Sequence, residues 1–176
     1  VNSPLPELFN TPEMRYHLER ARGMYVEFAK AQGGGKYIIL NGSSFGPNNG
    51  INTSTLLHEA LHAATNQRFA YAITSFREVS DNIAKGVEDP REGLLRAVGD
   101  LVSLQDQAST AYFEALAEGQ VSEALRIRVE STAQTVDGKT TINIFEDPRE
   151  FIAYGLSDPV FQEFLMTLPA LDNKQR

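Results

Sequence analysis

The amino-acid sequence predicts an α+β protein that is mainly helical and has a small β-sheet. Several segments carry apolar residues at helical spacing, one short β-branched and aromatic run lies between glycines, and two Asp-Pro pairs resemble helix starts. With 176 residues, of which 41% are hydrophobic, the chain is long enough for one globular domain spanning residues 1–176. It begins with Val1 rather than Met, which favours a processed chain or a domain excised from a larger protein.

The N-terminal third is expected to contain a helix followed by a strand. Residues 12–32 are interpreted as a helix, with Thr11 as its cap, Pro12 in its first turn and three consecutive glycines after it. The run "KYIILN", residues 36–41, is β-branched and aromatic and therefore predicts a strand. Such a strand either pairs with an extended peptide through an exposed edge or belongs to an internal sheet.

The middle of the chain is expected to be helical. Turn-forming residues lead into a helix that covers about residues 55–68 and is capped by Thr53 or Ser54. Two more helical patterns cover about residues 73–85 and 92–117. A glycine soon after the last pattern, Gly119, is expected to end that helix.

A β-hairpin is predicted around the Asp137-Gly138 pair. The supporting pattern is an alternation of two sets of residues, Thr141, Asn143 and Phe145 against Thr140, Ile142 and Ile144. A helix over residues 122–130 remains open as an alternative for the start of this region. Downstream, Asp147-Pro148 and Asp158-Pro159 predict two helices at about residues 148–155 and 159–165.

The composition excludes several classes of function. The formal charge is −7 and no long basic run occurs, so we expect no nucleic-acid partner. No apolar run approaches the roughly 20 residues that cross a bilayer, so we expect no membrane partner. The chain has no cysteine, so imidazole, carboxylate or carbonyl groups would have to hold any metal. The compartment is unknown, and a soluble protein that is cytoplasmic or delivered into a host cell fits these observations.

The stretch "TSTLLHEALHAAT" holds two of the three histidines, His58 and His62, around Glu59. At about 100° per residue, both imidazoles project from one face of a helix, and the carboxylate lies beside them while leucines and alanines fill the opposite side. Histidines at positions i and i+4 can therefore converge on one zinc ion. The alternative is the solvated polar face of an ordinary amphipathic helix.

A tetrahedral zinc site with two histidines and one open position needs a third protein ligand. His17 lies in a charged amphipathic stretch, where a surface or packing role is favoured over ligation. Glu150 is the favoured candidate, because it falls in the first turn of an expected helix and precedes three apolar residues. The alternatives for Glu150 are a charge that favours the helix start and an ion pair with Arg149 or a neighbouring basic group.

The run His58-Glu59-Ala60-Leu61-His62 matches the HExxH motif of zinc metallopeptidases. Together with Glu150 it resembles the gluzincins, in which a glutamate from a later helix completes the site, and "EFIA" is similar to the E-x-x-A pattern of phage-associated and lethal-factor-like members. Residues 36–68 and 147–165 also resemble metallopeptidase-like domains of phage or mobile-element polyproteins. The gap between His62 and Glu150 is longer than in compact gluzincins, and Tyr154 stands where the lethal-factor-like pattern has a second glutamate.

This resemblance implies a zincin-like fold in which His58, His62 and Glu150 hold one Zn²⁺ ion. Glu59 would be the general base that takes a proton from a metal-activated water. Tyr154 would donate to the developing oxyanion, or would be an aromatic side chain that packs half-buried against the site helix. Asp147 is expected to cap its helix, and orienting a ligand histidine is the alternative.

The expected function is that of a zinc-dependent endopeptidase, a hydrolase acting on a protein or peptide substrate. The alternative is a non-catalytic metallopeptidase-like module that binds a partner or serves as a structural part of a phage or mobile-element protein. In either case the chain could work within a larger polyprotein or a virion assembly.

Overall fold

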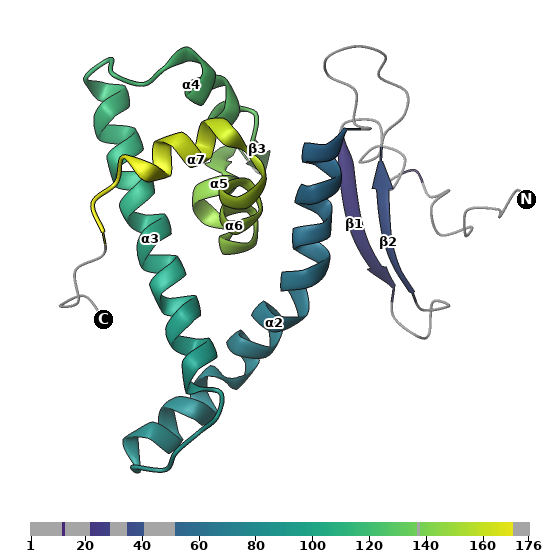
Figure 1. The fold of residues 1–176 in the computed structure, drawn as a ribbon, viewed down its shortest axis with the longest axis vertical. Helices are drawn as coiled ribbons and strands as arrows, with labels where there is room; N and C mark the ends of the chain where they lie inside the picture. Colours follow the sequence, from purple (N-terminus) through teal and green to yellow (C-terminus); the bar gives the residue numbers. More distant parts are fainter. Residues whose placement is uncertain (1–11, 13–21, 29–34, 41–51, 137, 171–176) are drawn as a thin grey trace, which may run out of the picture. The chain divides into compact units, whose positions relative to one another are not determined.

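A computed structural model of the chain describes residues 12, 22–28, 35–40, 52–136 and 138–170 (Figure 1). The described part is mainly helical with small antiparallel sheets, which confirms the predicted α+β class. Its elements, in chain order, are β1 (Gly23–Phe28), β2 (Gly35–Leu40), α2 (Thr53–Ala84), α3 (Glu92–Ala117), α4 (Glu123–Glu130), β3 (Ala133–Val136), β4 (Lys139–Ile142), α5 (Asn143–Glu146), α6 (Pro148–Ser157) and α7 (Pro159–Met166).

The chain forms two compact units, Val1–Ala63 and Ala64–Arg176, and each is described by itself. The boundary falls within helix α2, which is nevertheless one continuous helix of 32 residues. The expectation of a single domain over residues 1–176 stays a prediction.

The first unit contains an antiparallel pair of strands, β1 and β2, where Met24 lies opposite Ile39 and Glu27 opposite Lys36. The predicted strand over residues 36–41 is confirmed with a shift of one residue. The predicted helix over residues 12–32 is wrong for β1, although Pro12 is helical; the other positions in that range lie outside the described residues. The physical reason is that "GMYVEF" is rich in strand-forming side chains and β2 supplies the backbone partner.

Helix α2 begins one residue earlier than a cap at Thr53 or Ser54 would allow. The Asn52 side chain accepts a hydrogen bond from the backbone N–H of Thr55 at 2.8 Å, so Asn52 is the cap. The helices predicted over residues 55–68 and 73–85 are parts of this one helix, because no glycine or proline separates them.

The hydrophobic core of the second unit joins α3 to the four helices that follow it. Phe151 of α6 meets Phe161 of α7 edge to face, with ring centroids 5.6 Å apart, and the second ring is fully buried. The buried members of this core are Ala108, Tyr112, Leu125, Val129, Ile144, Phe151 and Phe161. Packing of these residues determines which face of α6 remains available for other roles.

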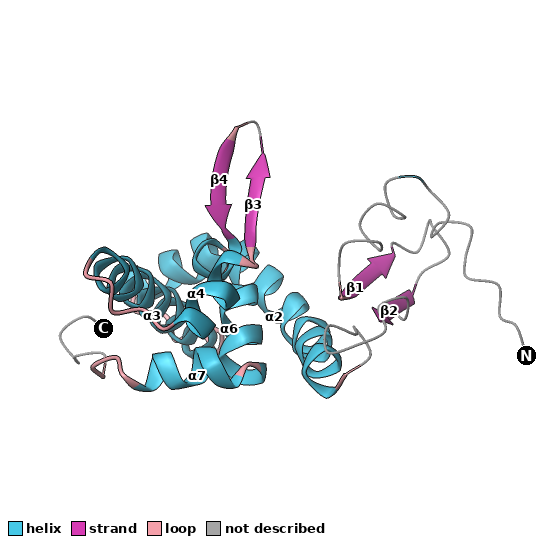
Figure 2. Ribbon diagram, turned by 90° about the horizontal axis from the view of Figure 1, so that it is seen from above, coloured by secondary structure: helices cyan, strands magenta, loops and turns pink. Residues whose placement is uncertain are grey.

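The region before residue 147 contains both predicted structures, first a helix and then a hairpin. Residues 123–130 form α4, and Ser122 caps it by accepting a hydrogen bond from the Leu125 N–H at 3.2 Å. The predicted hairpin follows as β3 and β4, and it projects from the helices of this unit (Figure 2). The predicted alternation is wrong after residue 142, because Asn143 and Ile144 turn into α5 and donate to Thr132.

The ends of the longer C-terminal helices follow their local sequence signals. Helix α3 has the predicted range, and Gly119 lies just beyond it with a φ of 70°. Asp147 accepts a hydrogen bond from the Arg149 N–H, and Asp158 accepts one from the Phe161 N–H. The two predicted Asp-Pro helix starts are therefore confirmed, and α6 and α7 extend slightly further than predicted.

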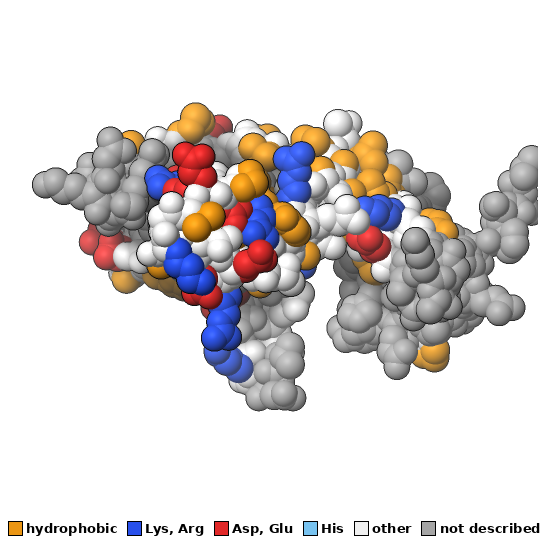
Figure 3. All heavy atoms as spheres, turned by 90° about the horizontal axis from the view of Figure 1, so that it is seen from below, with side chains coloured by type: hydrophobic (Ala, Val, Ile, Leu, Met, Phe, Trp, Pro, Cys, Tyr) orange, Lys and Arg blue, Asp and Glu red, His pale blue; other side chains and the backbone are white. Residues whose placement is uncertain are grey.

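Basic and acidic side chains lie close to one another on the surface in Figure 3. On α4, for example, Arg126 pairs with Glu123 at 2.9 Å and with Glu130 at 3.3 Å. Exposed pairs of this kind contribute little to stability, because water and salt screen them. Within the part of the chain that the structure describes, the helices lack the combination of length and apolar composition that crossing a bilayer requires.

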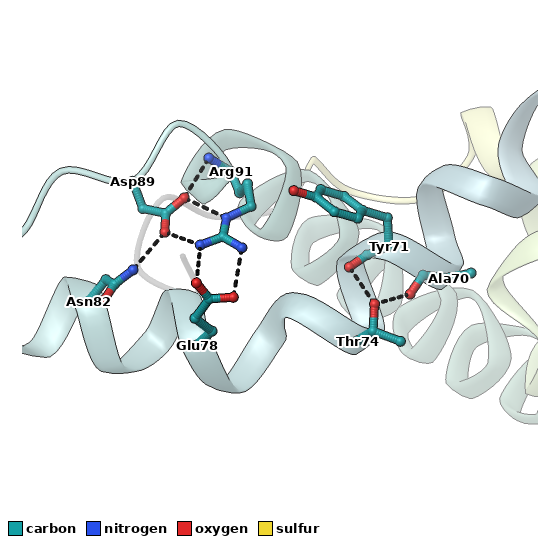
Figure 4. A network of polar contacts seen from close by, with 7 residues as sticks. All are labelled: Ala70, Tyr71, Thr74, Glu78, Asn82, Asp89 and Arg91. Carbon is teal, nitrogen blue, oxygen red and sulfur yellow. Dashed lines mark hydrogen bonds and ion pairs between the residues drawn. The ribbon is translucent and has the colours of Figure 1, made fainter.

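A cluster of polar side chains joins the end of α2 to the start of α3 (Figure 4). Arg91 donates to both oxygens of Glu78 at 2.9 and 3.0 Å and to Asp89 at 2.7 Å, while Asn82 donates to Asp89 at 2.9 Å. Asp89 is buried, and the hydrogen bonds from Arg91 and Asn82 hold its pKa well below the ordinary value. The charged form of Asp89 therefore stabilises this connection.

Replacing Asp89 by asparagine should lower the melting temperature at neutral pH but not in strong acid. Because the pKa is depressed in the folded protein, Asp89 contributes stability above the ordinary carboxyl pKa of about 3.9, and this contribution disappears as the pH falls further. Circular dichroism melts between pH 7 and pH 2 would measure the difference, with Asp81→Asn as an exposed control on α2. A constant difference over this range would contradict the prediction.

Candidate metal centre

The two histidines of the HExxH motif point toward each other from successive turns of α2. Their Nε2 atoms are 3.1 Å apart, and their ring centroids are 4.7 Å apart with an angle of 80° between the planes. Both side chains are half-buried. The four-residue spacing therefore places two nitrogen donors around a common point, as the sequence predicts.

This distance fits a shared zinc ion. Two ligands at 2.0–2.1 Å from a tetrahedral zinc are about 3.3–3.4 Å apart, and the observed nitrogen separation is close to that value. A hydrogen bond between the rings fits the same distance, with one neutral imidazole donating to the other. The nitrogens can thus meet a metal without a change in the backbone of α2.

Glu150 completes a group of possible metal ligands with the two histidines. Among the residues that the structure describes, ligand atoms of His58, His62 and Glu150 lie within 4.8 Å of one another, and all three side chains are half-buried. Two imidazoles and one carboxylate form a donor set typical of catalytic zinc sites that keep a fourth position open. The assignment of His58, His62 and Glu150 as metal ligands stays a prediction, as does metal binding itself.

The start of α6 determines where Glu150 lies. Asp147 caps the helix, and Phe151 and Ala153 are almost completely buried in the core, which leaves Glu150 on a less buried face. Arg149 forms an ion pair with Asp147, with 2.6 Å between Nη2 and Oδ2. The capping role predicted for Asp147 is confirmed.

Charge at the start of α6 is locally balanced. Burial raises the pKa of Asp147, but the hydrogen bonds and positive charge of Arg149 outweigh this effect and bring the pKa below its ordinary value. In return, Asp147 raises the pKa of Arg149. Both groups are therefore charged at neutral pH, directly beside Glu150.

Glu59 is buried against the first strand. Its exposed fraction is 6%, and a Cβ atom placed on Gly23 of β1 would come within 2.9 Å of Glu59 Cγ and 2.7 Å of Thr55 Cγ2. The group of possible ligands found among the described residues consists of His58, His62 and Glu150, and the role of Glu59 as a general base stays a prediction. Sequence reasoning missed Gly23, because its role depends on the packing of a distant helix.

Two further candidate site residues are Tyr154 and His17. The Tyr154 ring packs against the core and lies beneath the Arg128 guanidinium, whose Cζ is 6.0 Å from the ring centroid. These contacts support a packing role for Tyr154, and its oxyanion role stays a prediction. His17 lies outside the described residues, so its predicted surface or packing role is not tested.

Comparison of the chain with protein-family models, curated proteins and solved structures finds no match. The functional argument therefore depends on the motif and on the geometry of the candidate centre.

Replacing Gly23 by alanine should destabilise the protein by about 1–3 kcal/mol, the usual cost of overpacking. The added methyl group would meet Thr55 and Glu59 at distances shorter than van der Waals contact. Urea unfolding followed by circular dichroism would measure the change. Gly99→Ala on α3 is the matched control, because nothing lies within 4 Å of that added atom and alanine favours the helix. Equal stability of the parent and the Gly23 variant would show that this contact is not restrictive.

Proposed function

We propose that this protein is a zinc-dependent endopeptidase of the gluzincin type with a zincin-like fold. One observation carries the proposal: two imidazole nitrogens 3.1 Å apart on one helix share a ligand group with a carboxylate from a distant helix. The donor set, the HExxH spacing and the buried carboxylate beside the pair all support hydrolysis. In this proposal His58, His62 and Glu150 hold the ion.

The chemistry divides between the metal and one acid. A bound zinc ion supplies a Lewis acid and lowers the pKa of a coordinated water. Glu59 accepts the proton of the attacking water and delivers it to the leaving amine, so its carboxylate must be ionised at the start of the cycle. Glu59 follows His58 directly on helix α2, and its side chain packs against Gly23 of β1.

The substrate in this proposal is a protein or peptide in an extended conformation. β1 and β2 form a small antiparallel sheet whose first strand contacts the site helix at Gly23 and Glu59. An extended peptide can add to a strand edge through main-chain hydrogen bonds. Tyr154 is proposed as a donor to the carbonyl oxygen during attack, in addition to its packing contacts.

The Glu59→Gln variant should bind zinc like the parent protein and lose about 10²–10⁴-fold in turnover, because the amide cannot accept the proton. Cleavage of denatured proteins followed by mass spectrometry would measure turnover, and metal analysis would measure zinc. Glu118→Gln, an exposed change beyond α3, is the control. A parent protein that binds zinc but cleaves nothing, with a partner-binding activity unaffected by this substitution, would favour the non-catalytic module of a phage or mobile-element protein.

The Glu150→Ala variant should lose zinc affinity by more than about 100-fold, which exceeds the usual effect of an outer-shell change. Competition with a chromophoric chelator would measure the affinity, with Glu163→Ala on α7 as an exposed control. Unchanged stoichiometry and affinity would show that Glu150 is not the third ligand, and His17 would be the next candidate to replace.

A further inference from the structure

Arg149, the residue before Glu150, connects the start of α6 to helix α2. Its Nη1 donates a hydrogen bond to Asn66 Oδ1 at 3.1 Å. The opposite side of the same guanidinium is held by Asp147, through Nε at 2.9 Å and Nη2 at 2.6 Å. The planar group is thus held from two sides, and this restricts its orientation.

Asn66 lies on the helix that carries the histidines. It follows His62 by four residues, as His62 follows His58, so the three side chains occupy one face of α2 on successive turns. The hydrogen bond from Arg149 therefore reaches α2 one turn beyond the second histidine. Glu150 follows Arg149 directly in the chain, so this bond links helix α2 to the residue next to Glu150.

A carboxylate ligand must approach zinc to about 2.0–2.2 Å, so a small displacement of α6 changes the fit. Asp147 caps the first turn of α6 through a hydrogen bond from the Arg149 N–H, and the bond from Arg149 to Asn66 joins this turn to α2. Neither residue supplies a ligand atom to the described group. Their contacts can therefore act on the metal through the position of Glu150.

We propose that Asp147, Arg149 and Asn66 form a positioning clamp that holds Glu150 at the distance from His58 and His62 that zinc coordination needs. This inference rests on the proposed zinc site. Asn66 and Arg149 are positioning residues here, and their effect appears in metal affinity. Outer-shell partners of this kind typically change metal affinity by about 10–100-fold.

The test is a double-mutant cycle with zinc affinity as the readout. Asn66→Ala removes the acceptor, and Arg149→Lys keeps the charge but loses the planar group that bonds on two sides. Each variant should bind zinc about 10–100-fold more weakly than the parent, and the double variant should lose little more than either one, because both changes break the same link. Chelator competition measures affinity, and the melting temperature of the metal-free protein measures folding.

Arg126→Lys is the matched control, because its charge pairs lie within α4. It should bind zinc as the parent does. Parent-like affinity in Asn66→Ala, or fully additive losses in the double variant, would overturn the clamp even if the parent binds zinc. Failure of the parent to bind zinc would instead overturn the proposed site, and the inference with it. If Asn66→Ala does not fold, Arg149→Lys alone against its control decides the question.

Discussion

The four-residue spacing of two histidines on one continuous helix is the constraint on which the candidate site depends. It turns both Nε2 atoms toward a common point, 3.1 Å from each other. The same geometry turns the intervening Glu59 aside, where it is buried against β1. The five-residue HExxH motif thus places the two proposed tasks, metal binding and proton transfer, on different sides of two successive helix turns.

The position of Glu150, the proposed third ligand, depends on helix capping and core packing. Asp147 and Pro148 start α6 through local cap chemistry, and the burial of Phe151 then decides which face of that helix is left for Glu150. Asp158 and Pro159 start α7 in the same way, and Phe161 of α7 packs against Phe151. The aromatic core is therefore part of the support of the site, although its side chains have no chemistry of their own.

The differences from the sequence prediction have two causes, long-range contacts for β1 and α5 and the absence of a local stop signal for α2. The β1 segment has strand propensity, although its apolar residues also fit a helical period, and pairing with β2 makes it a strand. Residues 143–146 continue an alternating pattern, yet contacts with Thr132 and Gln105 turn them into α5. Helix α2 continues because no glycine or proline ends it, although the sequence pattern predicts two separate helices over residues 55–68 and 73–85. For β1 and for α5, contacts with residues distant in sequence override a weak local preference.

By itself the sequence determined the HExxH spacing, the mainly helical class, the range of α3, and the proline-marked starts of α6 and α7. These features depend on residues a few positions apart, so propensity, capping and periodicity suffice to predict them. Only the tertiary structure decided the close approach of Gly23 to Glu59 and the bond from Arg149 to Asn66. Those contacts join positions far apart in the chain, and only packing brings such positions together.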